Sequence, residues 1–152
     1  MTCFKEDLAY NIAFAKTMLK ERGKLSPMVV GVVGKDRIVF PFRFSDDEEQ
    51  RKLANIIKAE LRRLKADALI VLTEAWTLKL RHPALYNPAT RAKDHPNRKE
   101  GIVILYITKI STVRVIIPII RVLDTVEFGE QSVLITKTVN DKVWGDAFKE
   151  GV

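Results

Sequence analysis

The stretch that decides the fold spans residues 69–80 and reads LIVLTEAWTLKL. Its apolar and β-branched residues predict one long strand, in which side chains alternate between the two faces of a sheet. One face would then carry Ile70, Leu72, Glu74, Trp76, Leu78 and Leu80. Glu74 thus places a carboxylate within an apolar stripe, where it must find a partner or become protonated.

A polar insert follows this strand at residues 81–99, and the chain returns as an apolar strand at residues 102–109. The insert contains both histidines, His82 and His95, each followed by a proline. From residue 79 to residue 99 there are six basic residues and one acidic residue, so this segment carries six minus one, or +5, of the net charge of +7. Prolines restrict the backbone, and we expect an ordered basic loop within a single domain of residues 1–152.

Before this strand, the pattern predicts a helix at residues 3–22, a hairpin at 28–33 and 37–44, and a second helix at 46–65. The residues from Ser45 to Glu48 read as a capping box at the start of the second helix. Pro41 lacks a backbone donor, which predicts that the strand at 37–44 lies at an edge of the sheet.

After the insert, strands are expected at residues 102–109, 113–122, 125–128 and 132–139. Residues 113–122 are apolar on both faces, which is typical of a central strand, whereas Pro118 favours a bulge or an edge. Both alternatives remain open. The order α-β-β-α-β-β-β predicts an α+β fold in which an antiparallel sheet of five to seven strands carries two helices on one face. A second subunit could then cover the other face.

Composition sets the class of protein. A net charge of +7 and a pI near 9.6 favour a polyanionic partner, either nucleic acid or an acidic protein. The single cysteine, Cys3, excludes an intramolecular disulfide and fits a reducing compartment. Apolar runs are shorter than the roughly 18 residues that span a bilayer, and we therefore expect a cytoplasmic protein without a membrane contact.

Common catalytic signatures are missing from the sequence. It contains no cysteine pair, no His-Glu-x-x-His and no Gly-x-Ser-x-Gly, and one cysteine with two histidines is too few for a structural zinc site. We expect no metal, no cofactor and no catalysis.

Two short motifs flank the insert. The first is Glu74-Ala75-Trp76, and the second reads His-Pro-x-Arg-x-Glu from His95 to Glu100. Together they resemble a group of small proteins of bacteria and their phages to which no function is assigned. The element order resembles profilin-like and roadblock-type domains, and this resemblance implies a small adaptor or a homodimer.

Since the two motifs flank one loop between strands that should pair, Glu74 is predicted to form an ion pair with Arg98 or His95. One interpretation is a structural tether that anchors the loop. The other is a small site with Glu74 or Glu100 as general base, His95 as acid or metal ligand and Arg98 as an anion clamp.

Three functions remain as hypotheses: a homodimeric binding or adaptor protein without catalysis, a nucleic-acid-binding protein, and an enzyme. The nucleic-acid surface would use five residues of the insert: Arg81, Arg91, Lys93, Arg98 and Lys99. It would also use the basic face of the second helix: Arg51, Lys52, Lys58, Arg62, Arg63 and Lys65. The enzyme would use Glu74, His95, Arg98 and Glu100.

Overall fold

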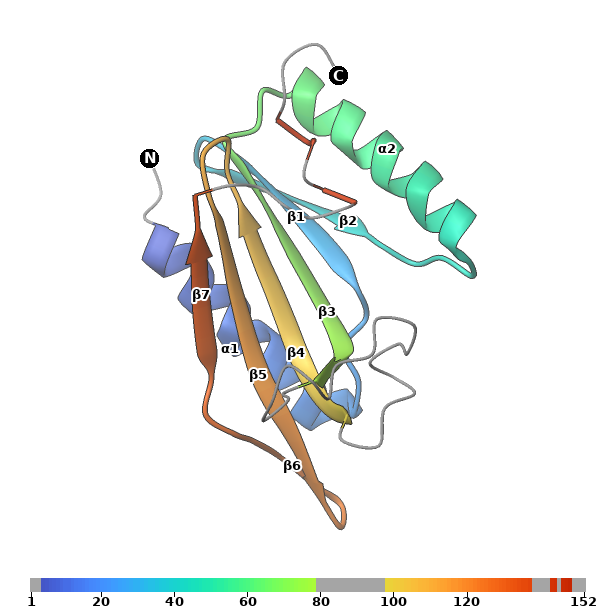
Figure 1. Cartoon of the computed structure of the whole chain (residues 1–152), viewed down its shortest axis with the longest axis vertical. Helices are drawn as coiled ribbons and strands as arrows, with labels where there is room; N and C mark the ends of the chain where they lie inside the picture. The colour runs from blue at the N-terminus through green and yellow to red at the C-terminus, as the bar shows by residue number, and fades with distance from the viewer. Residues whose placement is uncertain (1–3, 79–97, 138–142, 145, 149–152) are drawn as a thin grey trace, which may run out of the picture.

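The computed structural model describes residues 4–78, 98–137, 143–144 and 146–148, with two helices and one antiparallel sheet (Figure 1). The elements in chain order are α1 (Phe4–Arg22), β1 (Met28–Val33), β2 (Asp36–Pro41), α2 (Asp47–Arg63), β3 (Ala68–Leu78), β4 (Arg98–Ile107), β5 (Thr112–Val122), β6 (Thr125–Phe128) and β7 (Ser132–Thr136). The predicted α+β class, antiparallel pairing and element order are confirmed.

The seven strands form a sheet in the order β2-β1-β3-β4-β5-β6, and β7 pairs with β5. Strands β3 and β4 make the longest ladder, which runs from Leu69 opposite Ile107 to Leu78 opposite Arg98. The connection between these strands is the insert, most of which lies outside the described residues. Strand β2 is an edge, as Pro41 predicted.

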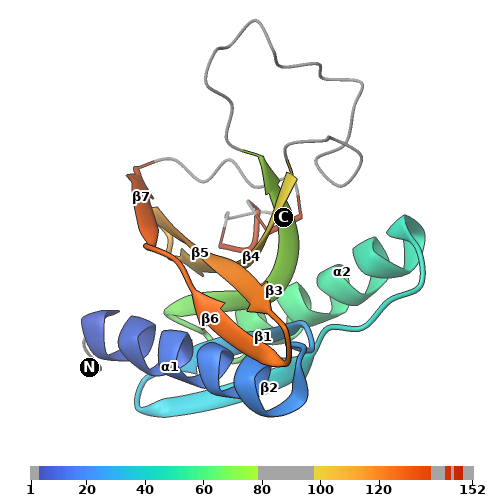
Figure 2. The same ribbon diagram turned by 90° about the horizontal axis from the view of Figure 1, so that it is seen from below.

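The two helices lie on opposite faces of the sheet, unlike the predicted arrangement with both on one face (Figure 2). On one face, Ala15 and Leu19 of α1 pack in a cluster with Ile70 of β3. On the other, Ile57 and Leu61 of α2 pack in a second cluster, which includes alternate residues of β3 and β4: Leu69, Val71, Leu105 and Ile107. Central strands with apolar residues on both faces need two covers, and each helix supplies one.

The start of α2 is capped one residue later than the Ser45 capping box implies. The side chain of Asp46 accepts the N–H of Glu49 at 2.8 Å, and the Glu49 carboxylate accepts the N–H of Ser45 at 3.2 Å. Two backbone donors are thereby satisfied, that of Glu49 in the first turn and that of Ser45 before the N-cap, in an arrangement similar to a capping box.

Pro118 lies where β5 changes its partner strand. The register of β7 with β5 ends at Ile116, and that of β6 begins at Ile119. Between them, the Pro118 carbonyl accepts the N–H of Gly129 at 2.9 Å, and a Cβ at Gly129 would lie 3.1 Å from that of Pro118. The missing donor of Pro118 therefore falls at a gap in the ladder, so β5 is central despite its proline.

Helix α2 packs directly against β1 at Gly31. A Cβ at this position would lie 2.5 Å from Cδ2 of Leu61, which is fully buried. Gly31 thus sets the distance between α2 and the sheet, because any side chain would enter the volume that Leu61 occupies.

We predict that Gly31→Ala lowers the free energy of unfolding by about 1–3 kcal/mol, the usual cost of overpacking a core. The change in urea midpoint measures it. The double variant Gly31→Ala/Leu61→Val should lose less than the sum of the two single changes, because the shorter side chain makes room for the methyl group. Additive losses would show that Leu61 is not the obstacle.

Candidate functional site

Glu74, the carboxylate in the apolar stripe, is bound by backbone. Its Oε1 accepts the N–H of Leu25, which is buried in the connection between α1 and β1. Leu25 belongs to the same core cluster as Ile70 and Leu72, so Glu74 faces the α1 side of the sheet, as the alternation predicted. This contact gives the carboxylate the hydrogen-bond partner that its position requires.

Glu100 is engaged by a neighbouring strand. Arg121 of β5 donates from Nε to Glu100 Oε2 at 2.7 Å and from Nη2 to the carbonyl of Gly23 at 3.0 Å. Gly23 follows the last turn of α1, at a φ of 75°. Glu74, Glu100 and Arg121, here called the connector clamp, therefore hold residues 23–25 against three adjacent strands.

Two of the residues predicted to be catalytic, Glu74 and Glu100, belong to the connector clamp. Glu74 binds the Leu25 N–H in the connection between α1 and β1, and Glu100 binds Arg121, which in turn donates to the carbonyl of Gly23. The predicted pairing of Glu74 with His95 or Arg98 involves side chains outside the described residues, as do the predicted roles of Arg81, Arg91 and Lys93. Lys99 lies exposed on β4. Within the described ranges, no group of three or more potential metal ligands is found.

Arg121 was missed at the sequence level, although a signal for it existed. Val115, Ile117 and Ile119 alternate on the face that packs against α1, and the next residue in that alternation is Arg121. A cation on the same face as two carboxylates of neighbouring strands would have been the natural partner.

Residues 143–144 and 146–148, here called the C-terminal segment, cover part of the predicted basic face of α2. Lys58 is only 5% exposed, and its Nζ donates to Asp146 Oδ1 at 2.7 Å and to the Val143 carbonyl at 2.9 Å. Arg62 donates to the carbonyls of Asp146 and Ala147 at 2.9 and 3.1 Å. The hydrogen bond from Lys58 lowers the pKa of Asp146 below its ordinary value.

These contacts correct the expectation of an open basic helix face. Of the six residues expected there, Lys58 and Arg62 bind the C-terminal segment, and Arg63 pairs with Glu60. Trp144 of that segment is buried, with its ring 5.2 Å from the ring of Phe42. Trp144 and Phe148 thus pack over the core on the α2 side of the sheet.

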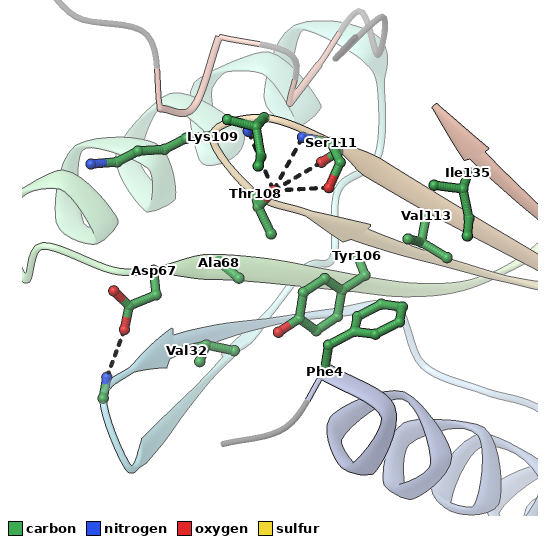
Figure 3. A pocket seen from close by; sticks show the side chains of 12 residues that line it. Phe4, Val32, Asp67, Ala68, Tyr106, Thr108, Lys109, Ser111, Val113 and Ile135 are labelled. Carbon is green, nitrogen blue, oxygen red and sulfur yellow. Dashed lines mark hydrogen bonds between the residues drawn. The ribbon is translucent and has the colours of Figure 1, made fainter. Parts of the chain in front are cut away.

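A hollow of about 800 Å³ opens at the end of the sheet from which β5 begins (Figure 3). Its apolar lining comes from Phe4, Val32, Ala68, Tyr106, Val113 and Ile135. Its polar rim includes Asp67, whose carboxylate accepts the N–H of Gly34 at 3.1 Å, and the turn from Thr108 to Ser111. The Thr108 hydroxyl accepts the N–H groups of Ile110 and Ser111, so this turn is closed on itself.

Next to Tyr106, which lines this hollow, lies a partly buried ion pair. Arg37 binds Asp7 in a bidentate manner, with Nε–Oδ1 at 2.8 Å and Nη2–Oδ2 at 3.1 Å. Burial raises the pKa of Tyr106, and the negative charge of Asp7 raises it further, while Arg37 opposes the rise. The Phe4 ring meets Tyr106 edge-on at 5.0 Å. The pair Asp7–Arg37 joins α1 to β2 at the end of the sheet opposite the connector clamp.

Strand β7 presents an unusual surface. Its central residues Val133, Leu134 and Ile135 are 50%, 57% and 66% exposed, and they lie on both faces of the strand. Ile110, in the turn beside Ile135 at the hollow, is also exposed. Within the described part of the chain, β5 is the one strand that pairs with β7, so the side of β7 that faces away from β5 is an edge of the sheet.

Comparison with known proteins places this chain in a phage family. A family model described as bacteriophage lambda protein ea47 matches residues 4–150. The match spans nearly the whole chain, so the chain belongs to this family. No curated protein and no solved structure matches it. The predicted phage relationship is thus confirmed, while the two-motif match and the resemblance to profilin-like and roadblock-type domains stay predictions. No helix in the described part of the chain could span a membrane.

The raised pKa of Tyr106 predicts a loss of stability in alkaline solution. An unfolded chain loses the tyrosine proton near the ordinary pKa of about 10. The folded protein holds this proton to higher pH, so stability is intact below about pH 10 and falls as pH rises toward the folded pKa. Urea midpoints between pH 8 and pH 11 should fall less steeply for Tyr106→Phe than for the wild type.

Tyr10→Phe is the matched control, because Tyr10 is exposed on α1. It should follow the wild-type pH profile. Equal slopes for Tyr106→Phe and Tyr10→Phe would contradict the assignment.

Proposed function

We propose that this member of the phage family is a small cytoplasmic binding protein that acts as a homodimer and carries out no catalysis. The observation that supports this proposal is the free edge of β7, with three consecutive large apolar side chains at least half exposed. Folded proteins normally protect such edges with charge, proline or a covering segment, because an open edge pairs with another strand.

The other edge of the sheet carries that protection. Strand β2 reads DRIVFP: it contains Asp36 and Arg37, and Pro41 removes one donor. Strand β7 reads SVLIT, with no charge and no proline. Strand β6, which lies on the same side of β5 as β7, carries the charged Glu127. Of the edge strands, β7 is therefore the one suited to pair with a partner strand.

We propose that the homodimer forms through the edge strand β7 and not through a face of the sheet. Helix α1 covers one face of the central strands, and α2 with Trp144 covers the other, so a second subunit is not needed there. The polar residues also favour a binding role: Glu74 and Glu100 are held in the connector clamp, and Lys58 anchors the C-terminal segment.

Leu134→Lys should convert the dimer to a monomer. A charge in the middle of β7 would have to be buried at the interface, and this costs several kcal/mol unless it is paired. Light scattering after size exclusion, over a range of concentrations, measures the change. Leu134 is 57% exposed, so the substitution should not disturb the core. At concentrations where both proteins are monomeric, the variant and the wild type should melt at the same temperature.

Val39→Lys is the matched control on the opposite edge. Val39 is 58% exposed on β2, and the same substitution there should leave the dimer intact. A wild type that stays monomeric at high concentration would overturn the homodimer, and a dimeric Leu134→Lys protein would exclude β7 as its interface.

Nucleic-acid binding is a second candidate, favoured by the charge of +5 between residues 79 and 99. Binding would then depend on the insert, because α2 uses part of its basic face to hold Val143, Asp146 and Ala147. Phosphate contacts release counterions, so the affinity should fall steeply between 50 and 200 mM salt.

The triple change Arg91→Ala, Lys93→Ala and Arg98→Ala should weaken binding to duplex or single-stranded DNA by about tenfold or more, and it should flatten the salt dependence. Changing Arg51, Lys52 and Lys65 of the α2 region to Ala removes the same charge and should have a smaller effect. An affinity that is independent of salt would exclude this function.

A further inference from the structure

We infer that two copies of this chain pair antiparallel along β7 about a two-fold axis at Leu134, which sets Lys137 opposite Gln131 of the partner subunit, one residue from its Glu130. The inference rests on the proposed homodimer and specifies its geometry. It follows from the charges that flank β7, the position of its apolar residues and the protection of the opposite edge.

The charges around β7 are asymmetric. The strand itself, Ser132–Thr136, is uncharged. Glu130 precedes it, Lys137 follows it directly, and both are exposed. An antiparallel pair of identical strands sets the start of one against the end of the other, so each acidic end meets a basic end. A parallel pair would set like charges side by side, which is destabilising.

The apolar residues are arranged symmetrically about Leu134. In the register with β5, Val133 and Ile135 lie opposite Val115 and Val113 on the α1 side, and Leu134 lies opposite Arg114 on the other side. A two-fold axis at Leu134 sets this residue against Leu134 of the partner subunit. It also sets Val133 against Ile135 of the partner subunit, and the reverse, on the α1 side.

This arrangement buries the exposed apolar side chains of β7 on both faces of the joined sheet. Cross-strand pairs of large apolar residues stabilise a sheet, and a two-fold axis supplies each unlike pair twice. It also satisfies backbone groups that β5 leaves free. An unrelated peptide could use the backbone, but a second copy in addition matches the charges at both ends.

Disulfide trapping tests the register. In a Cys3→Ser background, Leu134→Cys places two thiols directly opposite each other, where the Cα atoms of paired strands lie about 4.5–5.5 Å apart. This separation fits a disulfide. We expect nearly complete crosslinking of Leu134→Cys under mild oxidation.

Thr136→Cys is the control within the same strand. In this register the two cysteines at position 136 are separated by four residues, or about 13 Å, along the strand direction. They should not crosslink. Crosslinking of Thr136→Cys, or none of Leu134→Cys in a protein that still dimerises, would overturn the register while leaving the homodimer in place.

Charge reversal tests the end contacts. Glu130→Lys and Lys137→Glu should each raise the dimer Kd by about tenfold, because each change affects two contacts at once. The double variant should return the Kd to near the wild-type value. A double variant as weak as the single ones would overturn the attraction between the acidic end at Glu130 and the basic end at Lys137. If no variant and no wild type dimerises, the proposed function itself fails.

Discussion

Everything in this fold depends on the fact that β3 and β4 bury apolar side chains on both faces. Such strands cannot sit at a surface, so the chain must provide two separate covers. The first comes from its N-terminus, α1, and the second from its middle and end, α2 and residues 143–148. Gly31 allows the second cover to approach closely, because it leaves room for Leu61. Burial on both sides therefore sets the positions of the elements around the central ladder.

The buried or half-buried ionic groups fasten these covers to the sheet. Arg37 holds Asp7 near the start of α1, and Arg121 with Glu100 and Glu74 holds the connection after its end. On the other face, Lys58 holds the C-terminal segment to α2. Each fastening joins segments far apart in the sequence. Four residues that the sequence suggested for catalysis or nucleic-acid binding thus have a structural contact: Glu74, Glu100, Lys58 and Arg62.

Much of the fold was predictable, because the element boundaries depend on local patterns. Alternation in residues 69–80, helical spacing in residues 3–22 and the proline at position 41 each have a local cause. The faces on which the helices pack had no such signal: the sequence shows that both sides of β3 need cover, but a helix or a second subunit would satisfy that need equally. The structure resolves this alternative in favour of the helices.

The candidate site was harder to predict because its contacts are long-range. Glu74 was expected to bind the insert that follows its strand, and in the structure it accepts the N–H of Leu25. Lys58 was expected to be a solvated lysine on the basic face of α2. Helical periodicity predicts the face on which a residue lies, but it does not predict which segment packs against that face. Asp146 and Val143, which accept the hydrogen bonds of Lys58, lie more than eighty positions away in the chain. The periodicity of a sequence predicts which face of a helix or strand a side chain lies on, whereas the residues that this side chain contacts depend on the topology of the whole fold.

The contrast between the two sheet edges limits how this protein can assemble. Polymerisation by strand addition needs two competent edges per molecule, so that each unit joins a neighbour on either side. Here Pro41 and two charged residues mark β2, while β7 is plain and apolar. A sheet with one such edge has a valency of one, so association through β7 would end at a closed pair instead of a fibril.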